Sequence, residues 1–233
     1  MDQRLHRKDK MSPVQIITNL RAGTMFTWRL LGLNLVGVPT GSGSLKPHHT
    51  HMRIDDAVRH GWYRTLYEAQ KPTIYIVRDI RDVLVSQFHF MEALMTDFHG
   101  FLHGKANPRS MIKRGKNIIP APPSLYPVIQ ERIREAPIHA WVEHTQWIHE
   151  GWVDFYKYED IVECQEAFIS YLVRRYKLKP YPGRLRTVDK LVGIKPRKGV
   201  VGGWKDYFDD HNLNYLWNIA GTRMEELGYE KLC

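Results

Sequence analysis

Cysteine is scarce in this sequence. Cys164 and Cys233 are the only two among 233 residues, and no pair of cysteines has C-x-x-C spacing. A disulfide scaffold needs several pairs of cysteines, and a zinc knuckle needs closely spaced ligands. The sequence therefore supports neither a disulfide framework nor a structural zinc site.

A long apolar run is also lacking. No stretch of about 18 consecutive apolar residues occurs, so the sequence predicts no membrane span. Residues 1–10, MDQRLHRKDK, are charged and contain no apolar segment of the kind found in a secretory signal. We therefore expect a cytoplasmic protein in which residues 1–12 form a flexible tail.

Positive charge is present in excess. The formal net charge is +9, and 43% of the residues are hydrophobic. This hydrophobic content suits a single domain over residues 13–233. The charge favours an anionic ligand such as a nucleotide, a nucleic acid, a membrane surface or an acidic substrate, but a basic protein without such a ligand would have the same composition.

Strand-like and helix-like patterns alternate along the chain. Strands are predicted at 14–18, 33–39, 72–77 and 151–160. Helices are predicted at 24–33, 54–70, 82–94, 139–150, 164–178 and 211–227. This alternation predicts an α/β fold in which helices flank a central parallel sheet.

Residues 97–127 interrupt the alternation with a segment rich in Gly, Pro, Lys and Arg. A connection of this length is usually either functional or disordered. Two interpretations stay open: a lid or acceptor-pocket insertion, or a partly disordered insertion.

The turn after the first predicted strand, NLRAGTMFTW, contains residues suited to phosphate. In parallel α/β proteins, ligands bind at the carboxyl ends of the strands. Gly23 lets the backbone approach an anion, Thr24 adds a hydroxyl and Arg21 adds a fixed charge. The Walker A pattern is absent, because no second glycine followed by lysine occurs. Taken alone, such a stretch is more often an ordinary strand–helix turn.

The stretch YIVRDIRDVLVSQFHF places four charges where the third predicted strand ends. Arg78 falls at the strand end and Ser86 lies eight residues later in the next helix, so both could converge on one anion. Asp82 is predicted to be the N-cap of that helix. Arg81 and Asp82 are otherwise expected to be surface charges with one partner each.

A third basic segment, PRKGVVGGWKDYF, lies near the C-terminus. Arg197 and Lys198 precede Gly199, so this loop could wrap closely around a phosphate. Taken alone, RKG is a common solvated charge cluster.

Together, the three segments resemble the motifs of sulfotransferases that use 3′-phosphoadenosine-5′-phosphosulfate (PAPS). That family has a PKSGTTW-type loop for the 5′-phosphosulfate, an RDxRDVxVSxxxF strand and helix for the 3′-phosphate, and an RKGxxGxWK segment that closes over that phosphate. This chain has LRAGTMF, RDIRDVLVSQFHF and RKGVVGGWK in the same order, and DFYKYEDI resembles the family's strand ending in Tyr-Glu-Asp. The resemblance covers about residues 14–208 and implies a P-loop-like, sulfotransferase-like architecture.

The resemblance implies roles for the matched residues. Arg21 stands where the family usually has lysine, and Phe26 stands where it has the tryptophan beside the adenine. Ala22 and Met25 offer only backbone N–H groups. Tyr158 matches an adenine-edge tyrosine, although both aromatic residues would also suit the core. The implied nucleotide-binding set is Arg21, Ala22, Gly23, Thr24, Met25, Phe26, Arg78, Ser86, Tyr158, Arg197, Lys198 and Gly199.

The family's general base is a histidine between the first loop and the Arg–Ser motif, and HTHM places His51 in the matched position. We expect His51 to take the proton from the acceptor while Arg21 stabilises the developing charge. His49 is the alternative base or a helper. HHTH would also suit a metal-binding loop or a merely polar one.

The implied donor is PAPS, the implied product is adenosine 3′,5′-bisphosphate (PAP), and no metal is required. The acceptor would be a hydroxyl or amine on a small molecule or a glycan. The alternatives are a P-loop small-molecule kinase and a nucleotide-binding member without activity. A nucleic-acid partner is not expected, because the basic residues cluster at strand–helix loops rather than along one helix.

Overall fold

The structure is a computed structural model that describes residues 13–19, 22–38, 49–50, 55, 72–91, 98, 102, 111–114, 117–120, 137–188 and 201–231. The chain forms two compact units. Unit 1 comprises Met1–Arg78 and Gln146–Pro196, and unit 2 comprises Asp79–Thr145 and Arg197–Cys233. The predicted tail, residues 1–12, lies outside the described residues, and the single domain over 13–233 stays a prediction.

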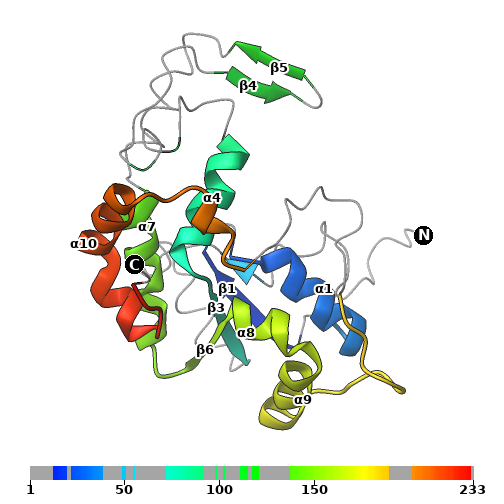
Figure 1. Ribbon diagram of the computed structural model, residues 1–233. Coiled ribbons are helices and arrows are strands. Elements are labelled where there is room, and N and C mark those ends of the chain that lie inside the picture. Colours follow the sequence, from blue (N-terminus) through cyan, green and yellow to red (C-terminus); the bar gives the residue numbers. More distant parts are fainter. Residues whose placement is uncertain are drawn as a thin grey trace. The chain divides into compact units, whose positions relative to one another are not determined.

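Unit 1 contains a parallel sheet with the strand order β2-β1-β3-β6 (Figure 1). Its strands are β1 (Gln15–Thr18), β2 (His49–Thr50), β3 (Thr73–Val77) and β6 (Val153–Lys157). The register pairs Gln15 with Thr73 in β1–β3 and Thr73 with Val153 in β3–β6. Every residue of β1 and β3 is buried, as is typical of central strands in a parallel sheet. The predicted α/β fold with a parallel sheet is confirmed.

Three helices in the described part of unit 1 contribute to its core. They are α1 (Thr24–Asn34), α8 (Tyr158–Glu163) and α9 (Gln165–Tyr176), and α1 contacts α9. Residues at alternate strand positions, such as Ile74 and Ile76, point to one face of the sheet. There they join a buried cluster with Leu30 and Leu31 of α1 and Ile169 of α9. Apolar burial on this face therefore holds α1 and α9 against the sheet.

The described part of unit 2 consists largely of helices. They include α4 (Ile80–Met91), α7 (Pro137–His144), the 3₁₀-helix η5 (Gly203–Asp206) and α10 (Asp210–Glu226). Helix α7 contacts both α4 and α10, and η5 contacts α4. The antiparallel hairpin of β4 (Met111–Arg114) and β5 (Asn117–Pro120) lies within the predicted insertion 97–127. Among the described residues, no helix combines the length and apolar character needed to cross a membrane.

The strand predicted at 33–39 is wrong. Helix α1 continues to Asn34, and Leu35 forms only an isolated bridge with Pro180. The Asn34 side chain donates to the Leu30 carbonyl at 2.8 Å, and Gly37 adopts a φ of 85°. The apolar residues of this stretch are therefore the end of a buried helix and a turn, which resemble a short strand in sequence.

Two other predicted elements have different boundaries. The strand predicted at 151–160 ends at Lys157, and Tyr158 begins α8, whose first turn carries two acidic residues. Acidic side chains are favourable at a helix N-terminus. The helix predicted at 139–150 is α-helical to His144 and continues as the 3₁₀-helix η4 (Thr145–His149). The predicted helix 54–70 lies outside the described residues, except for Asp55, which is helical.

Replacing Asn34 tests the junction at the end of α1. Asn34 is 3% exposed; its amide donates to the carbonyls of Leu30 and Arg186, and its oxygen accepts from the Arg186 amide at 2.7 Å. We expect Asn34→Ala to lower the free energy of unfolding by about 1–3 kcal/mol, because the partly buried amide and carbonyl of Arg186 lose their hydrogen bonds to the Asn34 side chain. Chemical denaturation measures the change. Asn214→Ala, at an exposed position of α10, is the control; an equal loss in both variants would contradict the assignment.

Candidate functional site

The turn between β1 and α1 is closed by short contacts. Ala22 is fully buried, and its amide donates to the Asn19 carbonyl at 3.2 Å. Gly23 has a φ of 91°, a left-handed conformation that favours glycine. The hydroxyls of Thr18 and Thr24 are 2.6 Å apart, so a hydrogen bond fixes the start of α1 to the end of β1.

The first turn of α1 suits an anion. Its residues include no acidic side chain, and the N-cap position is occupied by Gly23, which offers no side-chain hydrogen bond. Backbone N–H groups at a helix N-terminus carry a partial positive charge and can donate to phosphate oxygens. Met25 is partly buried against the core. Arg21 lies outside the described residues.

Tyr158 is the centre of the site in unit 1. Its ring occupies the place where a side chain at position 23 would lie, so a Cβ on Gly23 would overlap it. Phe26 meets the same ring edge-to-face, with centroids 5.6 Å apart. The Arg78 guanidinium lies 4.8 Å from the ring centroid, within the range of a cation–π contact. One aromatic ring thus contacts the β1–α1 turn, helix α1 and the residue that follows β3.

The histidine segment lies beside the first strand. In the parallel pair β1–β2, His49 is opposite Ile16 and Thr50 is opposite Ile17. Parallel strands end at the same edge of a sheet, so β2 ends at the edge where the β1–α1 turn begins. His51 follows β2 in the sequence and lies outside the described residues, as do Arg197, Lys198 and Gly199.

Arg81 and Asp82 are not the surface charges that the sequence suggested: they are 3% and 4% exposed. The Arg81 guanidinium donates to Asp79 with both Nε and Nη2, and its Nη1 donates to the Glu230 carbonyl at 3.1 Å. It also lies 4.1 Å from the centroid of Trp204. Besides Asp79, the partners of these two residues come from the C-terminal part of the chain, which covers them.

Asp82 is also not the N-cap of the helix that follows β3. Helix α4 begins at Ile80, so Asp82 lies within its first turn. Its two carboxylate oxygens accept from the backbone amides of Gly202 at 2.8 Å and Trp204 at 3.1 Å. Ser86 lies one turn later on the same face of α4.

The structure brings together part of the predicted nucleotide set. Contacts through the ring of Tyr158 join three predicted residues of unit 1, namely Gly23, Phe26 and Arg78. Sequence reasoning missed Asp82 and Trp204 as a linked pair. The only available signal was the repeated Arg-Asp in RDIRD, because no local pattern reveals a partner 122 residues away.

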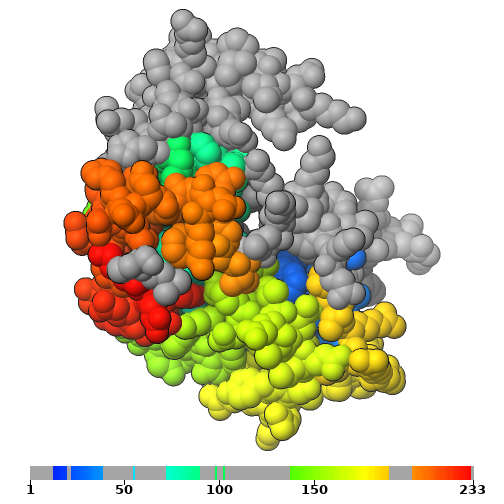
Figure 2. All heavy atoms as spheres, in the orientation of Figure 1, coloured from blue at the N-terminus to red at the C-terminus, as the bar shows by residue number. Residues whose placement is uncertain are grey.

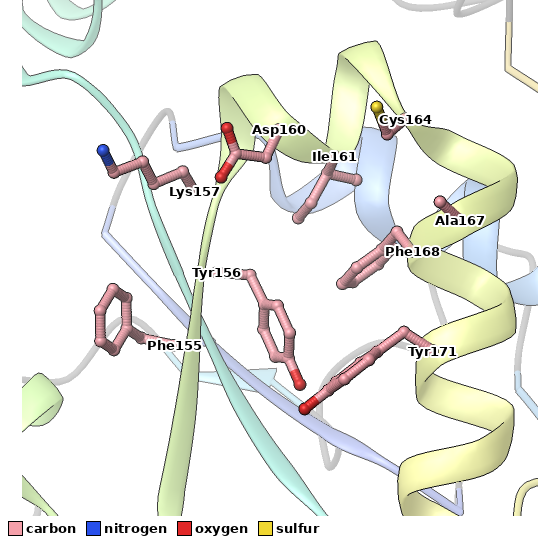
Figure 3. A pocket seen from close by; sticks show the side chains of 9 residues that line it. All are labelled: Phe155, Tyr156, Lys157, Asp160, Ile161, Cys164, Ala167, Phe168 and Tyr171. Atoms are coloured by element: carbon pink, nitrogen blue, oxygen red, sulfur yellow. The ribbon is translucent and has the colours of Figure 1, made fainter. Parts of the chain in front are cut away.

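A separate hollow of about 370 Å³ lies between β6 and helices α8 and α9. Figure 3 shows the hydroxyl ends of Tyr156 and Tyr171 approaching each other, and Lys157 pointing away from the aromatic rings. The hollow is lined by Phe155, Tyr156, Lys157, Asp160, Ile161, Cys164, Ala167, Phe168 and Tyr171. None of these nine residues belongs to the predicted nucleotide set.

Two tyrosines that share a hydrogen-bond network, Tyr156 of β6 and Tyr176 of α9, have raised pKa values. The Tyr156 and Tyr176 hydroxyls are 3.3 Å apart, Tyr176 donates to Asp154, and Arg175 donates to the same carboxylate. Burial raises the pKa of Tyr156 to about 12. Burial, followed by the hydrogen bond to Asp154, also raises the pKa of Tyr176. Both phenols therefore stay protonated at neutral pH.

The described residues contain no group of three His, Cys, Asp or Glu side chains that could hold a metal ion.

The chain matches one known protein family and resembles solved structures. The sulfotransferase domain family matches residues 43–195. The structure of mouse sulfotransferase SULT7A1 complexed with PAP has a TM-score of 0.52 at 14% identity, covering 93% of this chain and 86% of that chain. Retinol dehydratase in complex with androsterone and inactive cofactor PAP has a TM-score of 0.45 at 15% identity, covering 93% and 82%. The search of curated proteins gave no match. The similarity to SULT7A1 shows a shared fold.

Substitution of Gly23 tests the packing at the turn. We expect Gly23→Ala to lower the free energy of unfolding by more than the roughly 1–2 kcal/mol of left-handed strain, because the new methyl group also meets Tyr158. Gly183→Ala is the matched control, since Gly183 has a φ of 104° and no atom within 4 Å of an added Cβ. In a Tyr158→Ala background, the excess cost should disappear. A double-mutant cycle without coupling between the two positions would contradict the contact.

Alkaline pH tests the buried phenol. An unfolded tyrosine has a pKa of 10.0, whereas folding raises the pKa of Tyr156 to about 12. The folded state therefore retains a proton that the unfolded state loses, so the free energy of unfolding falls as pH rises from 10 to 12. Denaturant unfolding at several pH values should give a shallower fall for Tyr156→Phe. Tyr181→Phe, at an exposed position, is the control; identical slopes in Tyr156→Phe and wild type would refute the prediction.

Proposed function

Because this chain belongs to the sulfotransferase domain family, we propose that it transfers a sulfuryl group from PAPS to a hydroxyl or amine of an acceptor molecule. The observation that carries the proposal is the contact of one ring, Tyr158, with both Gly23 and Arg78. It joins the turn that would hold the 5′-phosphosulfate to the arginine that would hold the 3′-phosphate.

The residues at this turn suit a phosphosulfate group. Gly23 keeps the backbone free of a side chain where α1 begins, and the first turn of α1 carries no acidic residue that would repel an anion. The backbone amides of Thr24 and Met25 are of the type that can donate to phosphate oxygens, because the first N–H groups of a helix have no partner within the helix. Arg21 would add the fixed positive charge.

The 3′-phosphate would be held by a second set of residues. Arg78 supplies a guanidinium fork, Ser86 supplies a hydroxyl, and the segment 197–199 supplies two cations and a glycine. Phe26 and Tyr158 would contact the adenine, although in this structure they also contact each other within the core. ATP carries phosphates only at its 5′ position, so it would leave this second set of residues without a phosphate to bind. The second set therefore favours PAPS over ATP.

The proposed chemistry needs a proton acceptor and fixed cations. When bound, PAPS supplies a sulfonate joined to the 5′-phosphate through an oxygen that leaves as the acceptor oxygen or nitrogen bonds to sulfur. His51 would take the acceptor's proton, because an imidazole can accept a proton near neutral pH. Arg21 would stabilise the charge that develops on the leaving phosphate oxygen, with PAP as the product. His49, whose backbone lies beside Ile16, is the alternative base.

The acceptor is proposed only by class, as a small molecule or a glycan. Residues 97–127, which include the β4–β5 hairpin, would help to form its pocket. We further propose that residues 13–233 act as one domain, in the cytoplasm and without a metal.

Nucleotide binding separates this proposal from a kinase. We expect PAP without metal to raise the melting temperature of the full chain, and ATP with magnesium to leave it nearly unchanged, because only a ligand that binds the folded state stabilises it. Stabilisation by ATP with magnesium but not by PAP would favour the kinase alternative.

Replacing His51 tests the general base. With labelled PAPS and a panel of phenols, alcohols, amines and glycans, His51→Ala should lower the transfer rate by roughly 10²–10⁴-fold while PAP binding is retained. His139→Ala, at an exposed position of α7, is the control and should keep wild-type activity. Full activity in His51→Ala together with loss in His49→Ala would move the base to His49. Absence of transfer to the entire panel by a wild-type chain that binds PAP would favour the inactive alternative.

A further inference from the structure

A short loop after α9, residues 179–186, is fixed at both ends by one residue of α1. The Tyr181 amide donates to the Asn34 carbonyl at 2.8 Å. The Asn34 side chain donates to the Arg186 carbonyl at 2.8 Å and accepts from the Arg186 amide at 2.7 Å. The 179–186 loop is therefore ordered by contacts within unit 1, and a partner would not have to order it.

Apolar and basic side chains of this segment separate into an inner and an outer set. Leu178 is buried in the core cluster, and Leu185 packs against the same cluster. Lys179, Arg184 and Arg186 are exposed. The loop therefore presents its cations to solvent while its apolar residues hold it to the core.

The charge of this part of the chain has one sign. Residues 167–188 contain six Lys or Arg residues and no Asp or Glu. The six, all exposed, are Arg174, Arg175, Lys177, Lys179, Arg184 and Arg186. Arg175 pairs with Asp154 at 3.3 Å, and Arg184 pairs with Glu166 at 3.8 Å. Two acidic partners for six cations leave an excess of positive charge, and exposed ion pairs of this kind are weak enough to be exchanged for another anion.

Two large apolar side chains are exposed beside these cations. Tyr181 is 46% exposed and Val36 is 37% exposed. The Val36 amide donates to the Lys179 carbonyl at 2.9 Å, which places Val36 next to the loop. Tyrosine rings favour the boundary between lipid and water, and lysine and arginine are attracted to anionic headgroups. An aromatic ring, an aliphatic side chain and several cations on one surface therefore suit a lipid surface.

The tip of the loop projects into open space. The Arg184 side chain is 91% exposed, and no atom lies within 4 Å of a Cβ added to Gly183. In Figure 2 the segment that follows α9, in gold, lies on the surface beside blue atoms from the N-terminal part of unit 1. Proteins that bind single-stranded nucleic acids enclose the backbone in a basic groove. A projecting tip instead suits a broad, flat partner such as a membrane.

We propose that the 179–186 loop, together with Val36, binds this protein to the surface of membranes that contain anionic phospholipids. The cations contact the phospholipid headgroups, and Tyr181 and Val36 enter the boundary between the headgroups and the acyl chains. The protein lies on the membrane and does not cross it. This proposal does not depend on sulfuryl transfer, because none of its residues belongs to the predicted nucleotide set.

Cosedimentation of the full chain with vesicles tests the charges. Wild type should bind vesicles of phosphatidylcholine mixed with phosphatidylserine, and bind vesicles of phosphatidylcholine alone much more weakly. The double variant Lys179→Gln, Arg184→Gln should lower the partition coefficient on the anionic vesicles by roughly tenfold or more, because each cation near such a surface contributes about fivefold. The double variant Lys205→Gln, Lys231→Gln removes the same net charge from exposed positions in unit 2 and should change it by less than about threefold.

A second pair of variants tests the apolar contact. Tyr181→Ser should lower the partition coefficient on the anionic vesicles, because the ring no longer enters the lipid boundary. Tyr171→Ser is the matched control, since Tyr171 is 45% exposed on α9, and it should bind as wild type. Melting temperatures show whether each variant is folded. If the loop double variant does not fold, Arg184→Gln alone changes a side chain that is 91% exposed and should lower the partition coefficient by roughly fivefold.

Each outcome has one meaning. Loss of vesicle binding in the loop variants but not in their controls supports the membrane surface. An equal loss in the Lys205, Lys231 variant overturns it, because net charge alone would then explain the binding. Absence of wild-type binding to the anionic vesicles also overturns it. So does a loop variant that keeps vesicle binding but loses binding to a single-stranded oligonucleotide, which would assign the loop to nucleic acid.

Discussion

Parallel hydrogen bonding of β1, β3 and β6 is the constraint on which the candidate site depends. Because the three strands run in the same direction, the residues that follow them lie at one edge of the sheet. The Gly23 turn follows β1, Arg78 follows β3 and Tyr158 follows β6. A one-residue slip of any strand would move its side chains to the opposite face and separate the three.

The ring of Tyr158 connects the residues at this edge of the sheet. Its ring fills the space beside Gly23, meets Phe26 and lies beneath the Arg78 guanidinium. Because the Tyr158 ring leaves no room for a side chain at position 23, only glycine fits there. The left-handed conformation of Gly23 in turn allows α1 to begin directly after the turn. The turn, the arginine and the helix are held by packing rather than by charge pairs alone.

In unit 2, the charged residues Arg81 and Asp82 are buried and bind other parts of the same unit. Burying an arginine or an aspartate is costly unless hydrogen bonds replace its contacts with water. Asp79 and Glu230 provide such bonds for Arg81, and the backbone of Gly202 and Trp204 provides them for Asp82. The charge-rich end of β3 thus serves two purposes: Arg78 belongs to the candidate ligand site, while the next charged residues secure the C-terminal segment.

Local patterns in the sequence were sufficient for part of the fold. The β-branched runs of β1 and β3, the alternation of strands and helices, and the placement of Arg78 at a strand end were all predictable, because each depends on neighbouring residues. The false strand at 33–39 arose because the apolar end of a buried helix has the composition of a strand. The early end of β6 was missed because a strand followed directly by a helix leaves no loop to mark it.

For the candidate site, prediction from the sequence was limited by contacts between residues that lie far apart in the chain. The burial of Arg81 and Asp82 depends on residues 120 to 149 positions later, and no local pattern encodes such a contact. Tyr158 was matched by resemblance, but its contacts with Gly23 and Arg78 follow from the sheet register. His51, Arg21 and residues 197–199 lie outside the described residues, so their roles stay predictions.

The most direct test of the two-anion account is a crystal structure of this protein with bound PAP. The account predicts that the 5′-phosphate lies at the backbone amides of the Gly23–Thr24 turn, and that the 3′-phosphate lies within hydrogen-bond distance of Arg78 and Ser86. A nucleotide bound away from the carboxyl edge of the sheet, or one held by a single phosphate with the other in solvent, would contradict it.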